Sequence, residues 1–492
     1  MTRWAAILTA LILAGCAGQA KLRVDPELTA LSTPLIGGLS QIRDKAIDAP
    51  DIDHLFIGGL NHLSAIDPDL RALAVGDEVI LSLADKAIAH APLPRSQDIG
   101  AWTETTQALI GQARGESKLI QLANSEALLQ AMFDGIMPML DTYSRYYSRS
   151  DARRNQANRN GFVGLGVDID AGPKGAYVRR VTKDGPAEIA GVIAGDIIVR
   201  AQGQRLAGQS LTVALRRLDG PRDSTVSLEL LRDGVALAVT ARRSLIIPQT
   251  VEADLSDGVL HLAVKSFNQR TAASIAEKVT EAGALRGIIL DLRGDPGGLL
   301  DQAVAVADLF LNEGVIATLR GRHPGARQFY AAAAGDIAAG VPIVMLLDGR
   351  TASAAEILAA ALQDDGRAIA VGTASVGKGT VQTIVPLSNG GEFALTWSRV
   401  FTPAGTMLSG RGILPDVCTG GGSTVSAEDM IAALVRQGPQ PRQSAEIVRA
   451  TCRPEPRGKE TPDLAVARAL ATDTAVRTAL LSPGAGQLAT TP

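Results

Sequence analysis

Residues 341–362 read VPIVMLLDGRTASAAEILAAAL, which is an apolar strand, a short polar turn and a helix rich in Ala and Leu. A run as uniformly apolar as Val341–Leu347 is typical of a strand buried on both faces, as in a parallel sheet covered by helices. Gly287–Leu292 is a second run of this kind, and strand and helix patterns alternate from about residue 245 to 417. This part of the chain therefore predicts an α/β core.

The composition of the whole chain limits its class. It has 492 residues, of which 46% are hydrophobic and 20% are charged, so it can bury a sizeable core and is not a disordered chain. The net charge of −3 supplies no overall field that would attract nucleic acid. Glycine is enriched, with 51 residues or about 10% against a usual ~7%, and follows no collagen-like period. We therefore expect these glycines at particular turns.

The region before the core has a different pattern. Apolar residues recur at helical spacing between positions 25 and 150, which predicts a helical N-terminal domain. The apolar positions that mark its amphipathic segments are Leu55, Leu60, Leu63, Leu128, Leu129, Met132 and Ile136. The polar, basic stretch 151–160 (DARRNQANRN) is predicted to be a linker.

Short strands and helices are predicted on both sides of the core. In the segment before it, the expected strands are Val163–Ile169, Ala176–Val181, Asp196–Ala201 and Thr225–Leu231, with a helix at Leu211–Leu218. After it, the tail is rich in Gly, Pro and Gln, with helices expected at Ala427–Arg436 and Asp463–Ala471.

The first residues are expected to be an address signal. Arg3 precedes the apolar stretch Ala5–Ala14, which is too short for a membrane span. The following Leu-Ala-Gly-Cys at 13–16 resembles a bacterial lipoprotein box, in which the signal is cut before the cysteine and Cys16 carries the lipid. Ala17 stands where inner-membrane lipoproteins often carry Asp, which favours the periplasmic side of a Gram-negative outer membrane. The alternative is an ordinary cleaved signal with an incidental cysteine.

Two cysteines remain in the rest of the chain, Cys418 and Cys452. In an oxidising compartment an even pair favours a disulfide, and this one would close a loop of ~35 residues, worth roughly 3–4 kcal/mol in the chain-entropy model. The alternative is two free thiols in the tail.

Ser353 is the first candidate for chemistry, because it lies on the turn between the predicted strand and helix. A nucleophile at that place gains from the free N–H groups of the helix N-terminus, which can also stabilise an oxyanion. The alternative is a structural capping box, since Glu356 follows three residues later.

Lys378 is the candidate base, because none of the five histidines lies in a recognisable catalytic motif. A lysine serves as base only where desolvation lowers its pKa far below the ordinary value, and a glycine-lined turn between buried strands offers such a place. One alternative is a solvated loop charge. Another is a P-loop, because Gly372-x4-Gly377-Lys378 nearly matches that motif, but Gly379 replaces its Ser or Thr and residues 380–387 resemble a strand rather than a helix.

Together these residues resemble the serine–lysine core of the carboxyl-terminal processing (tail-specific) proteases. Lys378 follows Ser353 by 25 positions and Gln382 follows Lys378 by four, as in that family. Further blocks agree, namely IILDLRGDPGGLL at 288–300, ALQD at 361–364, FTPAG at 401–405, GRGI at 410–413 and PD at 415–416. The resemblance covers roughly residues 140–420. It implies a mixed α/β fold, with a crotonase/Clp-protease-like protease core, an inserted PDZ-like β domain and a helical N-terminal region.

The resemblance also implies roles for single residues. Ser353 would be the nucleophile, Lys378 its general base and Gln382 the residue that orients the lysine. The oxyanion hole would use the backbone N–H of Ala354 and one from the loop that holds Gly297 and Gly298. Two positions depart from the family: Asp295 stands where Asn is usual, and Ala355 where Ser is frequent. We expect Asp295 to add negative charge near the hole.

A second resemblance concerns substrate selection. Gly164, Leu165, Gly166 and Val167 are similar to the carboxylate-binding loop of PDZ domains, and the run from 185 to 198 resembles the PDZ segment that joins a short helix to a strand. Loop N–H groups would hold a terminal carboxylate, and the peptide would add as a strand beside Val167–Ile169. Leu211 and Leu215 would line the side-chain pocket. The alternative is a small β domain with structural glycines.

The sequence thus predicts a serine endopeptidase with a Ser/Lys dyad, which cleaves periplasmic or envelope proteins that a PDZ domain recognises by their apolar C-terminal tails. No metal, cofactor or nucleic acid is expected. The alternative is a catalytically silent PDZ scaffold. The predicted parts are a signal peptide at 1–15, an anchor and helical domain at 16–150, the PDZ domain at 161–243, the protease core at 244–418 and a tail with short helices at 419–492. The N-terminal region is open to two further roles, oligomerisation or docking of an activating adaptor.

Overall fold

The structure is a computed structural model that describes residues 25–421, 426–437, 445–458 and 461–480. The predicted signal peptide and Cys16 lie outside these residues. The described chain forms two compact units, one of residues 25–44, 49–148 and 385–393, the other of residues 45–48, 149–384 and 394 onward. Among the described helices, none is long and apolar enough to cross a membrane.

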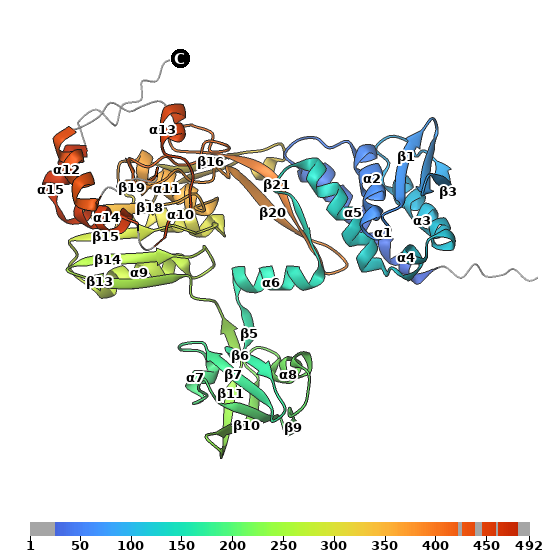
Figure 1. Ribbon diagram of the computed structural model, residues 1–492, viewed down its shortest axis with the longest axis horizontal. Helices are drawn as coiled ribbons and strands as arrows, with labels where there is room; N and C mark the ends of the chain where they lie inside the picture. The colour runs from blue at the N-terminus through green and yellow to red at the C-terminus, as the bar shows by residue number, and fades with distance from the viewer. Residues whose placement is uncertain (1–24, 422–425, 438–444, 459–460, 481–492) are drawn as a thin grey trace, which may run out of the picture. The chain divides into compact units, whose positions relative to one another are not determined.

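The first unit is mainly helical, as predicted (Figure 1). Its helices are α1 (Pro26–Lys45), α2 (Ile52–Asn61), η1 (His62–Ala65), α3 (Ile99–Glu116), α4 (Lys118–Leu122) and α5 (Ser125–Leu140). Side chains of Asp51, Asp98 and Asn124 accept hydrogen bonds from the first N–H groups of α2, α3 and α5, which is why these helices begin where they do. All seven apolar positions named from the sequence are buried.

The first unit also contains a sheet that the helical reading missed. Strands β1 (Leu70–Val75), β2 (Glu78–Leu83) and β3 (Lys86–Pro92) form an antiparallel meander, and β4 (Arg145–Tyr147) follows α5. The turn between β2 and β3 holds Ala84 and Asp85 at φ of 46° and 67°, which is the backbone of a two-residue hairpin turn. Few β-branched residues mark these strands, so their composition did not announce them.

Residues 385–393 belong to the first unit, although they lie far from it in sequence. They form the tip of the hairpin of β20 (Thr380–Pro386) and β21 (Glu392–Phe401). Within the unit, the ring of Phe393 packs edge-on against Phe133, with centroids 4.8 Å apart, and against Tyr146 at 5.9 Å. The hairpin tip is thus part of the hydrophobic core of the N-terminal domain.

The stretch predicted as a linker is a helix, α6 (Arg149–Asn160). Its sequence is so polar that only Ala152 is buried. It therefore has no apolar face from which a helix could be predicted. Asp151 and Arg154 pair along one side of the helix, three residues apart.

The segment from 161 to about 246 forms a β domain with its own core. Its elements are β5 (Phe162–Gly164), β6 (Val167–Ala171), β7 (Ala176–Val181), α7 (Pro186–Ile189), β8 (Ile197–Ala201), β9 (Gln204–Arg205), α8 (Leu211–Leu218), β10 (Thr225–Arg232), β11 (Val235–Arg242) and β12 (Ser244–Ile246). The order β11-β10-β8-β7-β6 places β6 at one edge of the sheet. The predicted strand Val163–Ile169 is two strands, because Gly166 at φ 75° turns the chain between them.

The α/β core is built on a six-stranded sheet in the order β13-β14-β15-β18-β19-β22. All neighbours in it are parallel except the edge pair of β13 and β14. Its strands are β13 (Val251–Ser256), β14 (Val259–Val264), β15 (Gly287–Asp291), β18 (Ile343–Leu347), β19 (Ala368–Gly372) and β22 (Val417–Cys418). The residues of β15, β18 and β19 are all buried, as expected for the apolar runs at 287–292 and 341–347 that contain β15 and β18.

Helices cover both faces of this sheet. On one face lie α9 (Thr271–Ala282), α10 (Leu300–Asp308) and α11 (Ala354–Asp364), which share a core with a second sheet that contains β16 (Val315–Arg320). This second sheet has the order β17-β16-β21-β20, with β17 at Gln328–Ala331 after the short turn η2 (Pro324–Ala326).

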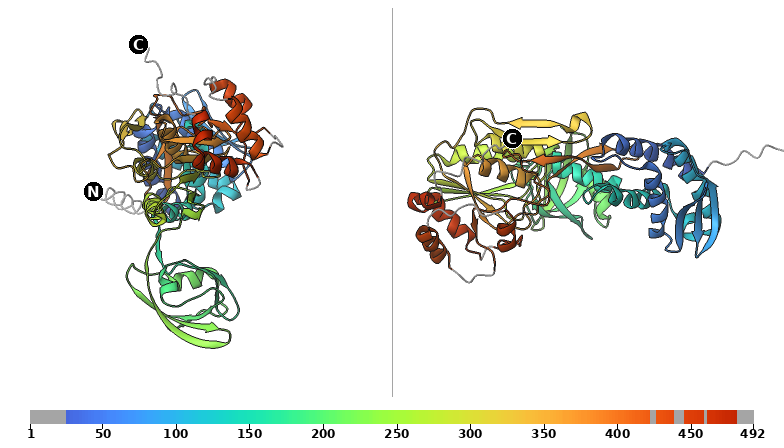
Figure 2. Two further views of the ribbon diagram at one scale, coloured as in Figure 1. Left: turned by 90° about the vertical axis from the view of Figure 1, so that its left-hand side faces the viewer. Right: turned by 90° about the horizontal axis from the view of Figure 1, so that it is seen from above.

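The tail covers the other face. Helix α14 (Asp463–Thr472) buries Val466, Ala467 and Leu470 against residues of β15, β18 and β19. Figure 2 shows it packed together with α12 (Ala427–Gln437) and α15 (Thr474–Leu480), all in red. The short helix α13 (Ala445–Thr451) completes the tail. The helices of the tail therefore form the layer on this face, because without them an apolar sheet face would be exposed to water.

Candidate active site

The turn between β18 and α11 is held in place by the buried carboxylate of Asp348. Asp348, directly after β18, accepts N–H groups from Arg350 and Thr351 at 2.9 and 3.1 Å and from Gly294, after β15, at 2.9 Å. The Thr351 hydroxyl donates to the carbonyl of Leu292 at 2.8 Å. These bonds fix the turn to the end of the neighbouring strand.

Ser353 ends this turn and precedes the first residue of α11. Its backbone has φ 55° and ψ −116°, a conformation that a residue with a side chain adopts only at a cost of about 1–3 kcal/mol. Such strain persists only where surrounding bonds over-determine it, and it concentrates at functional sites. Ser353 is partly exposed, while the next residue, Ala354, is buried.

Glu356 joins the serine to the lysine segment. This buried carboxylate accepts the N–H of Ser353 at 2.8 Å and that of Lys378 at 2.9 Å on the same oxygen, Oε2. Its other oxygen accepts the N–H of Gly377 at 2.7 Å and the hydroxyl of Ser375 at 2.5 Å. The two backbone nitrogens of Ser353 and Lys378 therefore lie within two hydrogen-bond lengths of each other. The carboxylate half of the predicted capping box is formed, and it also receives the second segment.

Burial raises the pKa of Glu356 above its ordinary value, and the hydrogen bonds from Ser375, Gly377, Ser353 and Lys378 lower it without cancelling that effect. A carboxylate that accepts four donors is the species these contacts suit, because a protonated acid would turn a donor toward one of them.

The glycines beside Lys378 allow a close approach of the segment 408–412. A Cβ on Gly379 would lie 2.1 Å from the backbone nitrogen of Ser409, and one on Gly377 would lie 3.0 Å from that of Gly412. Ser375 binds the same segment, accepting the N–H of Ile413 at 2.7 Å. Lys378 is half-buried on this packed turn, and β20 begins two residues later. Because a strand rather than a helix follows, the P-loop alternative does not hold.

Gln382 lies on β20 and is held by two threonines. Its Nε2 donates to the hydroxyl of Thr380 at 3.0 Å and to that of Thr396, on β21, at 3.1 Å. The amide is thus fixed in one orientation on the same strand that Lys378 precedes.

The loop at residues 295–298 packs against the serine from the other side. A Cβ on Gly297 would lie 2.8 Å from the nitrogen of Ala354 and 2.9 Å from the Cβ of Ser353, so only glycine fits there. The N–H of Gly297 donates to Oδ1 of Asp295 at 2.7 Å and is already engaged. Within the described part of the chain, the N–H groups of Ala354 and Gly298 have no acceptor. Of the two glycines proposed for the oxyanion hole, the exposed Gly298 is therefore the one with a donor to offer.

Asp295 departs from the expectation that it adds negative charge. It is fully buried, and burial raises its pKa to about 8, against a lowering by the hydrogen bond from Gly297. Burial thus favours the uncharged acid over the carboxylate at this position.

The segment after Cys452 packs against the turn that carries Ser353. Cys418 and Cys452 are joined by a disulfide with Cα atoms 5.9 Å apart. The carbonyl of Glu455 accepts the N–H of Gly349 at 2.9 Å, and Arg457 donates its N–H to Asp348 at 3.1 Å. The tail thus supports the back of the turn that carries Ser353.

The four residues proposed for carboxylate binding lie together at the edge of the β domain. Gly164 ends β5, Val167 begins β6, and among the described residues the N–H groups of Leu165 and Gly166 between them donate to no protein acceptor. Since β6 is an edge strand, a peptide can pair with it. Leu211 and Leu215, on α8, are 40% and 42% exposed although both are large and apolar.

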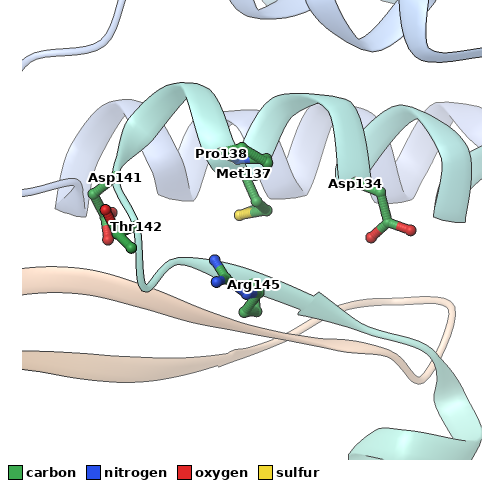
Figure 3. A pocket seen from close by; sticks show the side chains of 6 residues that line it. All are labelled: Asp134, Met137, Pro138, Asp141, Thr142 and Arg145. Carbon is green, nitrogen blue, oxygen red and sulfur yellow. The ribbon is translucent and has the colours of Figure 1, made fainter.

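The first unit also contains a pocket of about 330 Å³ between α5 and β4. Its lining residues, shown in Figure 3, are Asp134, Met137, Pro138, Asp141, Thr142 and Arg145. None of the site residues predicted from the sequence lines it.

Two parts of the chain match the models of known protein families. The family model for peptidase family S41 matches residues 258–419, and the PDZ domain model matches residues 177–232. The chain is 35% identical over 313 residues to the carboxy-terminal-processing protease of Bartonella bacilliformis, covering 62% of this chain and 72% of that protein. It is 30% identical over 333 residues to a probable CtpA-like serine protease of Staphylococcus aureus, covering 65% and 67%. Among solved structures, the photosystem II D1 C-terminal processing protease is similar at 29% identity and a TM-score of 0.36, over 62% of this chain and 88% of that one.

These matches define the chain as a peptidase that carries a PDZ domain. It belongs to peptidase family S41, among the carboxy-terminal-processing serine proteases.

Proposed function

We propose that this protein is a serine endopeptidase in which Ser353 is the nucleophile and Lys378 the general base. The observation that carries the proposal is the Glu356 carboxylate, whose single oxygen Oε2 binds the backbone of both residues. A neutral Lys378 Nζ would take the proton of the Ser353 hydroxyl as Oγ attacks the scissile carbonyl. It would then give that proton to the departing amine, and water would hydrolyse the acyl-enzyme in a second, equivalent step.

The N–H groups of Ala354 and Gly298 would receive the oxyanion of the tetrahedral intermediate. Each such donor is typically worth about 2.7–4 kcal/mol in the transition state. Gln382, held by its two threonines, still has a carbonyl oxygen that could accept a hydrogen bond from Lys378 and orient it.

Substrates would be proteins with apolar, unstructured C-terminal tails. The unengaged N–H groups of Leu165 and Gly166 suit a terminal carboxylate, the edge of β6 suits an added strand, and the exposed Leu211 and Leu215 suit an apolar side chain. We place the enzyme in the periplasm, anchored through lipidated Cys16 to the outer membrane, where envelope proteins would be its substrates. Loss of palmitate labelling in Cys16→Ser is the expected result, and labelling that persists would exclude this anchor.

The dyad is tested by cleavage of an unfolded protein with an apolar C-terminus. We expect the native protein to cleave it and both Ser353→Ala and Lys378→Ala to lose at least about 10²-fold in kcat, as expected when a nucleophile or general base is removed. Lys265→Ala is the matched control, because that lysine is exposed and pairs with the exposed Glu252. Cleavage that is unchanged in Ser353→Ala would exclude the dyad. Tail binding without cleavage by any form would support the scaffold alternative.

A further inference from the structure

Asp295 ties together the two loops that form the proposed oxyanion hole. It follows β15 and is fully buried. Its carbonyl accepts the N–H of Ala352, in the nucleophile turn, at 3.0 Å, and its Oδ1 accepts the N–H of Gly297 at 2.7 Å. A change in the charge of this side chain would therefore act directly on the loops of the proposed oxyanion hole.

The second carboxyl oxygen of Asp295 is the unusual feature. Oδ2 is buried and, within the described part of the chain, has no hydrogen-bond partner. A buried carboxylate with a single hydrogen bond is energetically costly. The protonated acid keeps the hydrogen bond from Gly297 and carries no charge, so its burial costs less. The burial of this side chain and its single hydrogen bond therefore favour the protonated acid over the carboxylate.

The two arginines that follow the ends of β15 and β18 already pair with other carboxylates. The guanidinium of Arg293 faces Asp291 at 2.7 Å and Asp463, and that of Arg350 faces Asp348 at 3.2 Å. The carboxylate of Glu356 accepts the backbone N–H groups of Ser353 and Lys378. The pKa of Asp295 is raised to about 8 by burial, against the Gly297 hydrogen bond, and no charge contributes.

We propose that Asp295 is a positioning residue that works as a neutral carboxylic acid, holding the Gly297 N–H so that the N–H of Gly298 is left for the oxyanion. This rests on the proposed function of Ser353. When Asp295 ionises, a negative charge stands beside the place where the oxyanion forms, and the transition state loses stabilisation. The enzyme thus has an upper pH limit that Asp295 sets, while its lysine base would by itself favour alkaline solution.

The test is kcat and KM against pH for the native protein, Asp295→Asn, Asp295→Ala and the control Asp301→Asn, an exposed aspartate on α10. For the native protein and the control we expect kcat to fall about tenfold per pH unit above about pH 8. Asp295→Ala should lower kcat at pH 7, and Asp295→Asn should restore most of it and abolish the alkaline fall, since an amide keeps the acceptor and cannot ionise. An alkaline fall that is the same in Asp295→Asn, or no rescue by Asn, would overturn the proposal.

A second readout does not depend on catalysis. Between about pH 4 and pH 8, the folded protein holds a proton on Asp295 that the unfolded chain has already released. The native protein therefore loses stability as pH rises through that range. We expect the Tm of Asp295→Asn to rise relative to the native protein as pH increases from 4 to 8, and the difference to be constant above that. A difference that is flat across this range would refute the neutral acid, even if Ser353→Ala shows that the proposed nucleophile is wrong.

Discussion

Replacing Glu356 by Gln tests the contact on which the site depends. The change keeps the shape of the side chain but turns one acceptor oxygen into an NH2 group. If the new group faces Ser375, that hydroxyl can rotate and accept, and the N–H of Gly377 is the one backbone donor left without an acceptor. If it faces Ser353 and Lys378, two buried N–H groups are left. The first arrangement is therefore the one we expect.

The cost follows from this count. A buried backbone N–H without an acceptor costs about 1–3 kcal/mol, and the bonds that remain lose the extra strength of a charged acceptor. Relief from burying the Glu356 charge offsets part of this. We expect Glu356→Gln to lower the free energy of unfolding by about 2–4 kcal/mol. Glu356→Ala should lower it further, because all four bonds are lost and a cavity is added.

The loss of activity should exceed the loss of stability. Ser353 and Lys378 are held by the same oxygen, and a misplacement of 1 Å can cost about 10²-fold in rate. The assay is urea unfolding together with kcat/KM under conditions where each variant is fully folded. Glu281→Gln, an exposed glutamate on α9, is the matched control and should change neither quantity. If Glu356→Gln keeps both its urea midpoint and kcat/KM within threefold of the native values, the reasoning is refuted.

Three further outcomes are expected. Replacing both Cys418 and Cys452 by Ser should lower the free energy of unfolding by about 4 kcal/mol, from their separation of 34 residues, and dithiothreitol should destabilise the native protein but not this variant. Burial would raise the pKa of Asp463, but the Arg457 guanidinium and other donors hold that pKa below its ordinary value. The ionised Asp463 therefore stabilises the fold above about pH 4, and this stabilisation is lost as pH falls through the folded pKa. Asp463→Asn should destabilise the protein at pH 7 and flatten its acid unfolding, and an unchanged acid midpoint would contradict this. Leu215→Lys should raise KM for a substrate with an apolar tail more than it changes kcat, and an unchanged KM would argue against the proposed peptide groove.

The sequence predicted the core well because its strands are buried on both faces. The run at 341–347 has no polar residue and that at 287–292 has one, Asp291, and the structure buries every residue of β15 and β18. The strand at 176–181 and the helix at 211–218 were predicted with their observed bounds, since each has a clear period and a clear end.

Elements without such a pattern were missed or misjudged. The sheet of β1, β2 and β3 lacks the β-branched composition that marks most strands, and α6 has no apolar face. Helices were predicted in the tail, but their role as the second layer was not, because that role depends on which sheet face is left bare. That is a property of the assembled sheet and of no single segment.

At the candidate site, the sequence predicted residues but not the contacts between them. Glu356 was considered only as a helix cap, because its bonds to Gly377 and Lys378 cross 21 and 22 residues of chain. The charge of Asp295 was judged from its residue type, whereas its burial reverses that expectation. In both cases the tertiary surroundings decide the chemistry of a side chain.

The most direct test of the central claim is covalent labelling of the nucleophile. The native protein is incubated with a biotinylated fluorophosphonate, which an activated serine attacks with loss of fluoride, and the labelled peptide is identified by mass spectrometry. We predict label on Ser353, none on that peptide in Ser353→Ala, and a rate at least about 10²-fold lower in Lys378→Ala but not in Lys265→Ala. Label on another residue, or labelling of Lys378→Ala at the native rate, would contradict the Ser353/Lys378 dyad.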